Sequence, residues 1–155
     1  MGVHKVIDET VKNDGLAAKL EALIPKGLDD IIRKNREHCQ IRHATDEDLA
    51  PILGTIGEDY PKLVITQWHL VTISAGGECK VVLLGDIADG TGNTWVTSKV
   101  VKLDLESGYL HTASGSLYLM AKKGDGEPSF EQLALLCTYL YRGGAGAFFG
   151  VPEFF

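Results

Sequence analysis

The stretch from residue 62 to residue 121 constrains the fold most, because short runs of β-forming residues alternate there with tight-turn sequences. The run LVITQWHLVTI is rich in β-branched and aromatic residues and is followed by the Ala-Gly-Gly of residues 75–77. Further turn sequences follow at residues 89–93, 106–108 and 114–115. Connections this short leave no room for crossover helices, so we expect consecutive strands to be antiparallel.

We predict five strands in this stretch, arranged as an antiparallel meander that forms a curled sheet or a small open barrel. The second strand, CKVVLLG at residues 79–85, contains the unbroken aliphatic run from Val81 to Leu84. Because such a run lacks the alternation of a half-exposed strand, it indicates a central strand that is buried on both faces. The later strands are expected in WVTSKVVKLDL, YLHTAS and SLYLMAKK.

A helix over residues 129–142 has the clearest start signal in the chain. Ser129 precedes Gln132 by three residues, which is the spacing of a capping box. The two glycines at 143–144 then suit the left-handed backbone of a helix end. We expect this helix to lie across the sheet through a wide apolar face made of Phe130, Leu133, Leu136, Cys137, Leu140 and Tyr141.

Two helices are predicted within residues 15–38 from apolar residues at helical spacing, namely Leu16, Leu20, Leu23 and Ile24, then Leu28, Ile31 and Ile32. A short third helix is predicted to begin at the cap Asp48 and to end at Gly57. Asp48 is preferred to Thr45, because a cap at Thr45 would place Pro51 too deep in the helix. The apolar stripe of the second helix is narrow, which makes residues 15–38 a candidate separable arm.

These elements define an α+β chain of 155 residues, of which 45% are apolar, enough to bury one core. We expect a single domain over residues 1–155. Its parts are a helical arm (1–57), the β-meander (62–121), the C-terminal helix (129–142) and a Gly/Phe-rich tail (143–155).

The charge pattern bears on the class of partner. A net charge of −6 comes from 21 acidic and 15 basic residues that are spread evenly along the chain, whereas nucleic-acid binders concentrate Lys and Arg on one face. The start MGVHKVIDE lacks the apolar run of a signal peptide, and no stretch has the roughly 20 apolar residues of a membrane-spanning helix. We therefore expect a cytoplasmic protein with no membrane partner. Its cysteines, Cys39, Cys79 and Cys137, should be reduced thiols.

His38, Cys39 and His43 form the densest group of possible metal ligands. On a continuing helix Cys39 and His43 would share a face, and thiolate and imidazole are good zinc ligands. A structural zinc site needs four ligands, however, and the sequence offers no second closely spaced pair. We therefore predict neither a metal site nor a cofactor, and interpret these residues as a solvated helix end, where the charge of His38 is favourable.

An alternative function is that of a small hydrolase or transferase using His69 or His111. Nearby hydroxyl groups would supply the nucleophile, from Thr97, Ser98, Thr112, Ser114 and Ser116. No nucleophile-elbow motif marks these serines, and threonine is common in strands as Ser-Gly is in turns. We therefore assign no catalytic residue.

A further alternative is a β module that binds single-stranded nucleic acid, because aromatic residues and lysines on small curled sheets can stack bases. The candidates are Trp68, Trp95, Tyr109, Tyr118, Lys99, Lys102, Lys122 and Lys123. The aromatic residues are interleaved with aliphatic core residues, and an acidic chain loses most phosphate-driven affinity. Nucleic acid is therefore not the expected partner.

The end of the chain carries four phenylalanines, Phe148, Phe149, Phe154 and Phe155. Chain ends are normally polar, so this tail either folds back over the core or anchors in pockets of another chain. Because no catalytic set stands out, we predict a noncatalytic protein-binding module, a small regulatory or inhibitory adaptor. Its contacts would involve the tail and one face of the meander or the N-terminal helices, and its partner would be another protein or a second copy of the chain.

Overall fold

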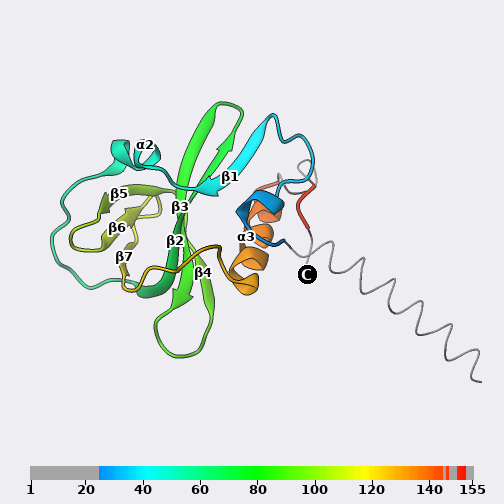
Figure 1. Cartoon of the computed structure of the whole chain (residues 1–155). Coiled ribbons are helices and arrows are strands. Elements are labelled where there is room, and N and C mark those ends of the chain that lie inside the picture. Colours follow the sequence, from blue (N-terminus) through cyan, green and yellow to red (C-terminus); the bar gives the residue numbers. More distant parts are fainter. Residues whose placement is uncertain (1–24, 145, 147–149, 153–155) are drawn as a thin grey trace, which may run out of the picture.

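The computed structural model of the chain describes residues 25–144, 146 and 150–152. Over these residues it is an α+β structure in which one mostly antiparallel sheet of seven strands is accompanied by one long helix (Figure 1). The elements in chain order are η1 (Leu28–Asp30), β1 (Cys39–His43), α2 (Asp46–Leu49), η2 (Ala50–Ile52), β2 (Leu63–Ala75), β3 (Glu78–Ile87), β4 (Thr94–Val96), β5 (Val100–Asp104), β6 (Tyr109–Thr112), β7 (Leu117–Met120) and α3 (Phe130–Arg142).

The strand order is β4-β3-β2-β7-β6-β5, with β1 paired to the other part of β2, and the sheet does not close. The antiparallel pairing expected of strands joined by tight turns is confirmed for β2–β3, β3–β4, β5–β6 and β6–β7. One pairing is parallel and was not expected. The first three residues of β2, from Leu63 to Ile65, pair with β7, because β1 occupies that edge of β2 only from Val71 onward.

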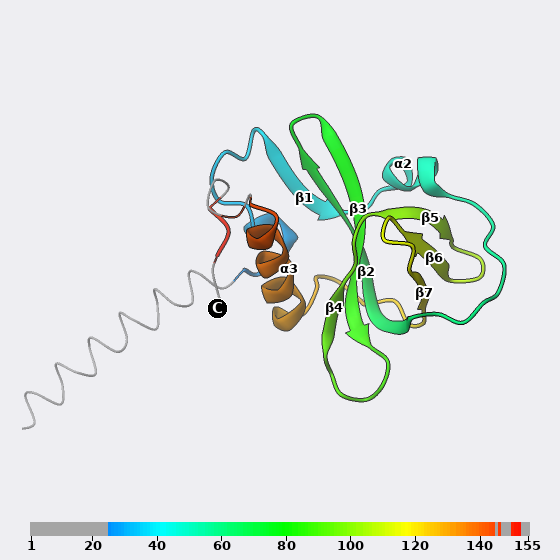
Figure 2. The same cartoon turned by 180° about the vertical axis from the view of Figure 1, so that it is seen from behind.

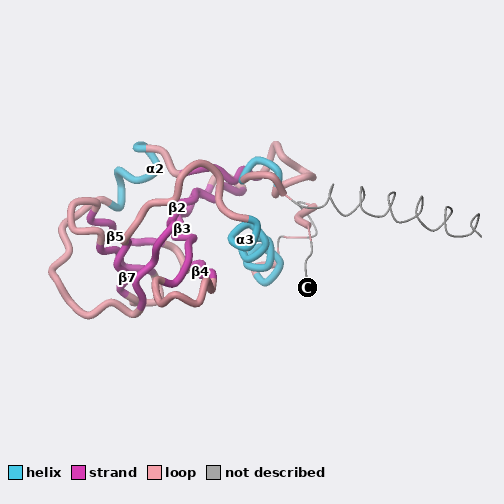
Figure 3. The backbone as a smooth tube through the Cα atoms, turned by 60° about the horizontal axis from the view of Figure 1, so that its bottom comes forward, coloured by secondary structure: helices cyan, strands magenta, loops and turns pink. Residues whose placement is uncertain are grey.

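The β2–β3 hairpin separates two apolar clusters. Helix α3 lies on one side of it and β5, β6 and β7 lie on the other (Figures 2 and 3). Within β3, Val82 and Leu84 belong to the cluster on the α3 side, whereas Val81 and Leu83 belong to the opposite one. All four are buried, which confirms the prediction of a strand covered on both faces.

The C-terminal helix is confirmed, together with its cap. Ser129 Oγ accepts a hydrogen bond from the Gln132 backbone at 3.2 Å, and Gln132 Oε1 accepts one from the Ser129 backbone at 3.0 Å. Gly144 provides the left-handed residue after the helix, at φ +84°. Phe130, expected on the apolar face, is 45% exposed. Among the described residues, no helix is both long and apolar enough to cross a bilayer.

The prediction of a second N-terminal helix is wrong, while the first one lies outside the described residues. Only the short 3-10 turn η1 forms after Gly27, and residues 39–43 form an edge strand instead. Asn35 interrupts the segment with a left-handed backbone at φ +55°. Pairing with β2 satisfies the backbone groups of β1 that face β2, and it joins part of the predicted helical arm of residues 1–57 to the sheet.

The third predicted helix is shorter than expected and has the other cap. Thr45 Oγ1 accepts from the Asp48 backbone at 3.2 Å, and the Asp48 carboxylate accepts from the Thr45 backbone at 3.0 Å. Pro51 is tolerated because α2 ends at Leu49 and Pro51 lies in the separate 3-10 turn η2.

The predicted five strands become seven for two reasons, of which β1 is the first. The second is that WVTSKVVKLDL breaks into β4 and β5 at Thr97 and Ser98. The Thr97 side chain takes over the pairing there, since its Oγ1 accepts from the Leu83 backbone at 3.0 Å. After this contact the chain leaves β3 and pairs with β6.

Candidate functional site

The edge of β3 near the hairpin tip is the most distinctive feature of the sheet. Strand β4 pairs only with residues 84–86 of β3, and the last contact of this kind joins Thr97 to Leu83. Residues 78–82 of β3 extend further, toward the tip. In Figure 1 the tip projects at the top with β1 on one side and no strand drawn on the other.

The register shows which backbone groups this edge presents. Leu83 donates its N–H to Thr97 Oγ1 and accepts from the Thr97 N–H, both at 3.0 Å, so its polar groups point away from β2. Backbone groups alternate between the two sides of a strand, which directs those of Cys79 and Val81 to the same open edge. Lys80 and Val82 direct theirs toward β2.

A groove of about 540 Å³ runs beside this edge. Its lining combines apolar and charged side chains, from Ile73, Ala75, Glu78, Cys79, Lys80 and Lys99. A second hollow of about 270 Å³ shares Cys79, Lys80 and Lys99 with the first and lies toward α2 and η2. The larger hollow is lined by Ile73 and Ala75 on the α3 side of the sheet and the smaller one by Thr72 and Val81 on the opposite side, so the two hollows flank the open edge.

The groove is basic in character. Lys99 is exposed and has no ion pair within the described residues. Lys80 is held in place by Tyr139, because its Nζ donates to the phenol oxygen at 2.7 Å and lies 4.9 Å from the centre of the ring. Glu78 is the acidic residue of the larger hollow. Asp48, which lines the smaller one, is already neutralised by Arg42.

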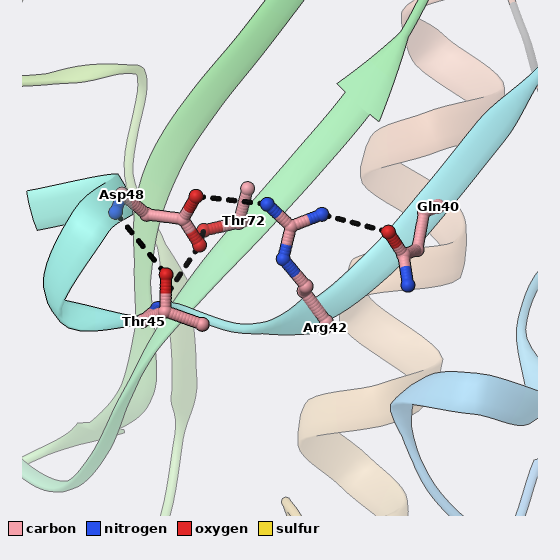
Figure 4. A network of polar contacts seen from close by, with 5 residues as sticks. All are labelled: Gln40, Arg42, Thr45, Asp48 and Thr72. Carbon is pink, nitrogen blue, oxygen red and sulfur yellow. Dashed lines mark hydrogen bonds and ion pairs between the residues drawn. The ribbon is translucent and has the colours of Figure 1, made fainter.

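Asp48 and Thr72 line the smaller hollow and belong to a network of polar contacts centred on Asp48 (Figure 4). Arg42 donates to Asp48 Oδ1 at 2.8 Å and to Gln40 Oε1 at 2.8 Å. Thr72 donates to Asp48 Oδ2 at 2.8 Å, and the capping contacts with Thr45 complete the set. The network ties β1, β2 and α2 together.

The electrostatics of this network indicate a structural role. Burial raises the pKa of Asp48, but hydrogen bonds from Thr45, Arg42 and Thr72 outweigh this effect and hold the pKa at about 2. The hydrogen bond with Asp48 raises the pKa of Arg42, and the nearby Cys79 thiol contributes to the same shift. Neither group exchanges a proton near neutral pH, so the pair braces the groove and does not serve as an acid or base.

The structure does not assemble the histidines expected for the enzyme alternative. His69 lies in β2 and is 4% exposed, whereas His111 lies in β6 opposite Lys102 and Leu117. Strand β7 lies between β2 and β6, so the two histidines are not on neighbouring strands.

The hydroxyl groups do gather, but without a histidine. Ser114 Oγ lies 3.0 Å from Thr112 Oγ1 and 3.2 Å from Ser98 Oγ, and Ser116 Oγ follows at 3.5 Å. Thr97 is outside this group, because it bonds to Leu83 and to the Ser98 carbonyl. The cluster forms part of the turn between β6 and β7, with no imidazole or carboxylate hydrogen-bonded to it in the described structure. A nucleophile, a base and an orienting acid are therefore not brought together here.

The weak metal candidates are also separated, because they lie in a strand instead of a helix. Residues four apart in a strand are about 13 Å apart, which places Cys39 and His43 too far from each other for one ion. Cys39 is buried, which raises the pKa of its thiol, and His38 is exposed. The described part of the chain contains no group of three or more His, Cys, Asp or Glu residues that could hold a metal ion.

Three of the four aromatic residues considered for nucleic-acid binding, Trp68, Trp95 and Tyr118, have internal contacts. Trp95 donates its indole N–H to the Tyr118 hydroxyl at 3.2 Å, and Tyr118 is 3% exposed. Lys62 covers the ring of Trp95, and Lys123 lies 6.0 Å from the centre of the Trp68 ring. These rings do not form a free platform for stacked bases.

The four tail phenylalanines lie outside the described residues, but their neighbour Val151 does not. Val151 is 3% exposed in the cluster on the α3 side, and its carbonyl accepts from the Tyr141 hydroxyl at 2.7 Å. At this point the tail folds back onto the core, as one of the two sequence-based alternatives supposes.

The groove was missed in the sequence because it depends on where β4 ends. WVTSKVVKLDL has no Gly or Pro to mark the break at Thr97 and Ser98. The one available signal was the side chain of Thr97, since hydroxyl residues can replace backbone partners where a strand ends.

Comparisons with protein-family models, with curated proteins and with solved structures find no match to this chain.

Proposed function

We propose that the chain is a noncatalytic protein-binding module, a small regulatory or inhibitory adaptor that takes an extended segment of a partner protein along β3. The observation that carries this proposal is the open edge itself. Cys79 and Val81 present backbone donors and acceptors there, beside a groove of about 540 Å³. A strand added at this position would pair with the same edge of β3 on which Thr97 already pairs with Leu83.

Strand addition obtains affinity from main-chain hydrogen bonds and specificity from alternate side chains of the added segment. The apolar groove residues Ile73 and Ala75 accept small aliphatic side chains of the partner. Lys80 and Lys99 favour a carboxylate in the same segment. The partner segment is therefore extended, with acidic residues alternating with small apolar ones.

The brace of Arg42 and Asp48 supports this use of the edge. An edge that is already ordered loses little conformational freedom on binding, and that loss is among the main costs of association. Because Asp48 joins Arg42 of β1 to Thr72 of β2, the strands behind the groove are held in register before a partner arrives.

The test is a selection of binders from a display library of random linear peptides, followed by amide hydrogen exchange of the protein with a selected peptide. The proposal predicts peptides of alternating acidic and small apolar residues. It also predicts that the amides of Cys79 and Val81 gain protection on binding, whereas those of Lys80 and Val82 are protected in both states. Protection of amides in other strands by the selected peptides would overturn the proposal. So would a change in protection that does not alternate from residue to residue along 79–82.

Charge reversal supplies a matched control. Lys99→Glu should weaken binding of the selected acidic peptide by about tenfold, because it places two like charges in contact. Lys102→Glu makes the same change at an exposed position of β5, outside the residues that line the groove, and should leave the affinity unchanged. Equal losses of affinity in the two variants would show that the peptide responds only to the net charge of the protein, and would contradict a specific groove.

The tail phenylalanines stay a predicted second anchor. Deleting residues 148–155 would remove the buried Val151 as well, so it would not separate binding from stability. Phe154→Ser combined with Phe155→Ser keeps Val151. If the tail is an anchor, this double variant loses affinity for a natural partner or for a second copy of the chain. It should also keep the thermal midpoint of the wild type. A large drop in that midpoint would place the rings in the core.

A further inference from the structure

A second polar cluster lies on the α3 side of β1 and β2, the face opposite the Asp48 network. His43 Nε2 is 2.9 Å from Glu127 Oε2, and the rings of His43 and His69 have their centres 5.6 Å apart. His43 and Glu127 are nearly half exposed, whereas His69 is buried. The cluster therefore brings a titratable pair at the surface into contact with a titratable group in the interior.

Glu127 connects this cluster to the first described segment of the chain. Its Oε1 accepts a hydrogen bond from the Leu28 backbone at 2.8 Å. The carboxylate fits there because Gly27 has no side chain, and a Cβ at that position would collide with it. Leu28 and its neighbours Ile31 and Ile32 are buried in the cluster on the α3 side. The carboxylate thus holds an apolar segment against the sheet.

His69 holds the loop that carries Glu127. Gly124 donates its N–H to the Trp68 carbonyl at 3.0 Å, and a Cβ on Gly124 would lie 2.5 Å from His69 Nε2. The loop backbone therefore packs directly on the imidazole. An imidazole that takes up a proton here must bring its charge into a buried contact with that loop.

The strand beneath His69 is irregular, which indicates stored strain. The β2–β3 register shifts between Thr66 and His69, and Gln67 has a left-handed backbone at φ +48°. Trp68 Nε1 is buried and has no hydrogen-bond partner within the described structure. Gln132 of α3 supports the bulge by donating to the Gln67 carbonyl at 3.0 Å. A strained backbone and an unpaired buried N–H persist only where the surrounding contacts impose them. Once those contacts weaken, the same free-energy costs favour a different conformation of the segment.

We propose that His43, His69 and Glu127 form a pH-sensitive latch. At neutral pH it holds residues 25–32 and the loop of residues 121–128 against the sheet, and protonation of both histidines releases them. Release uncovers the apolar side chains of Leu28, Ile31 and Ile32.

The charges around His69 explain the direction of the response. Burial lowers the pKa of His69, the nearby His43 and Lys123 lower it further, and Glu127 and Asp86 act in the opposite sense. One protonated imidazole pairs with Glu127. Partial burial raises the pKa of Glu127, but the hydrogen bonds from His43 and Leu28 outweigh this effect and lower the pKa. A second protonated imidazole, whose ring centre lies 5.6 Å from that of the first, is repelled by it, so the closed arrangement disfavours the second protonation.

The test is amide hydrogen exchange at about pH 7.5 and about pH 5, expressed as protection factors so that the intrinsic pH dependence of exchange cancels. Protection of residues 25–32 and 121–128 should fall by about tenfold or more, since each unit of pKa difference changes an equilibrium by that factor. Protection of residues 82–84 in β3 should fall by less than that of these two segments. Constant protection of the latch segments between these two pH values would overturn the proposal.

The variant His43→Gln separates the latch from general acid sensitivity. His43 is nearly half exposed, so the variant should fold, and the remaining His69 then has Glu127 as its counter-charge without a second imidazolium beside it. Acid release should be weakened in this variant and kept in full in the matched control His111→Gln, which alters a histidine outside the cluster. NMR titration of His69 in the wild type gives a second reading, and an ordinary histidine pKa for His69 would contradict the latch.

Discussion

Arg42 and His43 are consecutive residues of β1, and each holds a carboxylate from another segment, yet the two contacts are built for different conditions. Arg42 lies 2.8 Å from Asp48, and His43 lies 2.9 Å from Glu127. A guanidinium is charged at every pH at which proteins fold, whereas an imidazole changes charge near neutrality. The comparison shows that one short edge strand carries a permanent brace on one face and a conditional contact on the other.

The largest expected effect comes from breaking the permanent brace. Asp48→Ala removes the partner of Arg42, the acceptor for Thr72 and half of the capping box, so it should cost about 3 kcal/mol of unfolding free energy. Urea denaturation measures this cost. Glu47→Ala, in the same turn but exposed, is the control and should cost less than about 0.5 kcal/mol. A loss below about 1 kcal/mol for Asp48→Ala would show that the network is not a brace.

A smaller effect is expected where the loop packs on His69. Gly124→Ala inserts a methyl group into the contact with the imidazole and the Gln67 carbonyl, so it should cost about 2 kcal/mol. The control Gly57→Ala meets no atom within 4 Å. Thermal unfolding of both variants decides the comparison, and similar midpoints would mean that the loop is not held closely on the ring.

The pH dependence of stability should separate the two faces. The pKa of His69 is lowered below its ordinary 6.5, so the unfolded chain binds protons first and stability falls as pH drops below about 6.5. The pKa of Asp48 is lowered from 3.8 to about 2, so its contribution is complete above 3.8 and is lost only as pH falls from there toward 2. Urea midpoints measured downward from pH 7.5 should therefore begin to fall below about 6.5 and fall again below about 3.8, and His43→Gln should weaken the first of these falls.

The smallest expected effect is that of neutralising the exposed carboxylate at neutral pH. Glu127→Gln keeps an acceptor for the Leu28 backbone and loses only the charge, and half-exposed pairs contribute little, so it should cost about 0.5 kcal/mol or less. Urea denaturation at about pH 7.5 checks this value. A cost as large as that of Asp48→Ala would mean that the two contacts do not differ in kind.

The parts of the fold that were predicted correctly depend on neighbouring residues. The capping box of Ser129 and Gln132 acts within one turn of helix, and the hairpin turns act within a few residues. The run from Val81 to Leu84 likewise predicts burial on both faces without reference to any partner strand. Each of these signals is complete inside a short window of sequence.

The parts that were not predicted depend on segments far apart in the chain. Residues 39–43 carry polar and apolar residues in a pattern that suits a helix end as well as a strand, and only the free edge of β2 selects the strand. Likewise, His43 approaches Glu127 across 84 positions of sequence, so no spacing could reveal that contact. The groove beside Lys80 and Lys99 depends on β4 ending early, and that ending is set by a hydrogen bond with Leu83.

By itself the sequence determined an α+β chain with tight antiparallel hairpins and a capped C-terminal helix, because turn chemistry, β propensity and helix capping are short-range properties. The tertiary structure decided that β3 has an open edge beside a basic groove, and that Arg42 and His43 serve opposite faces of one strand. The physical reason is that strand register and side-chain contacts join residues which chain folding, not sequence spacing, brings within hydrogen-bonding distance.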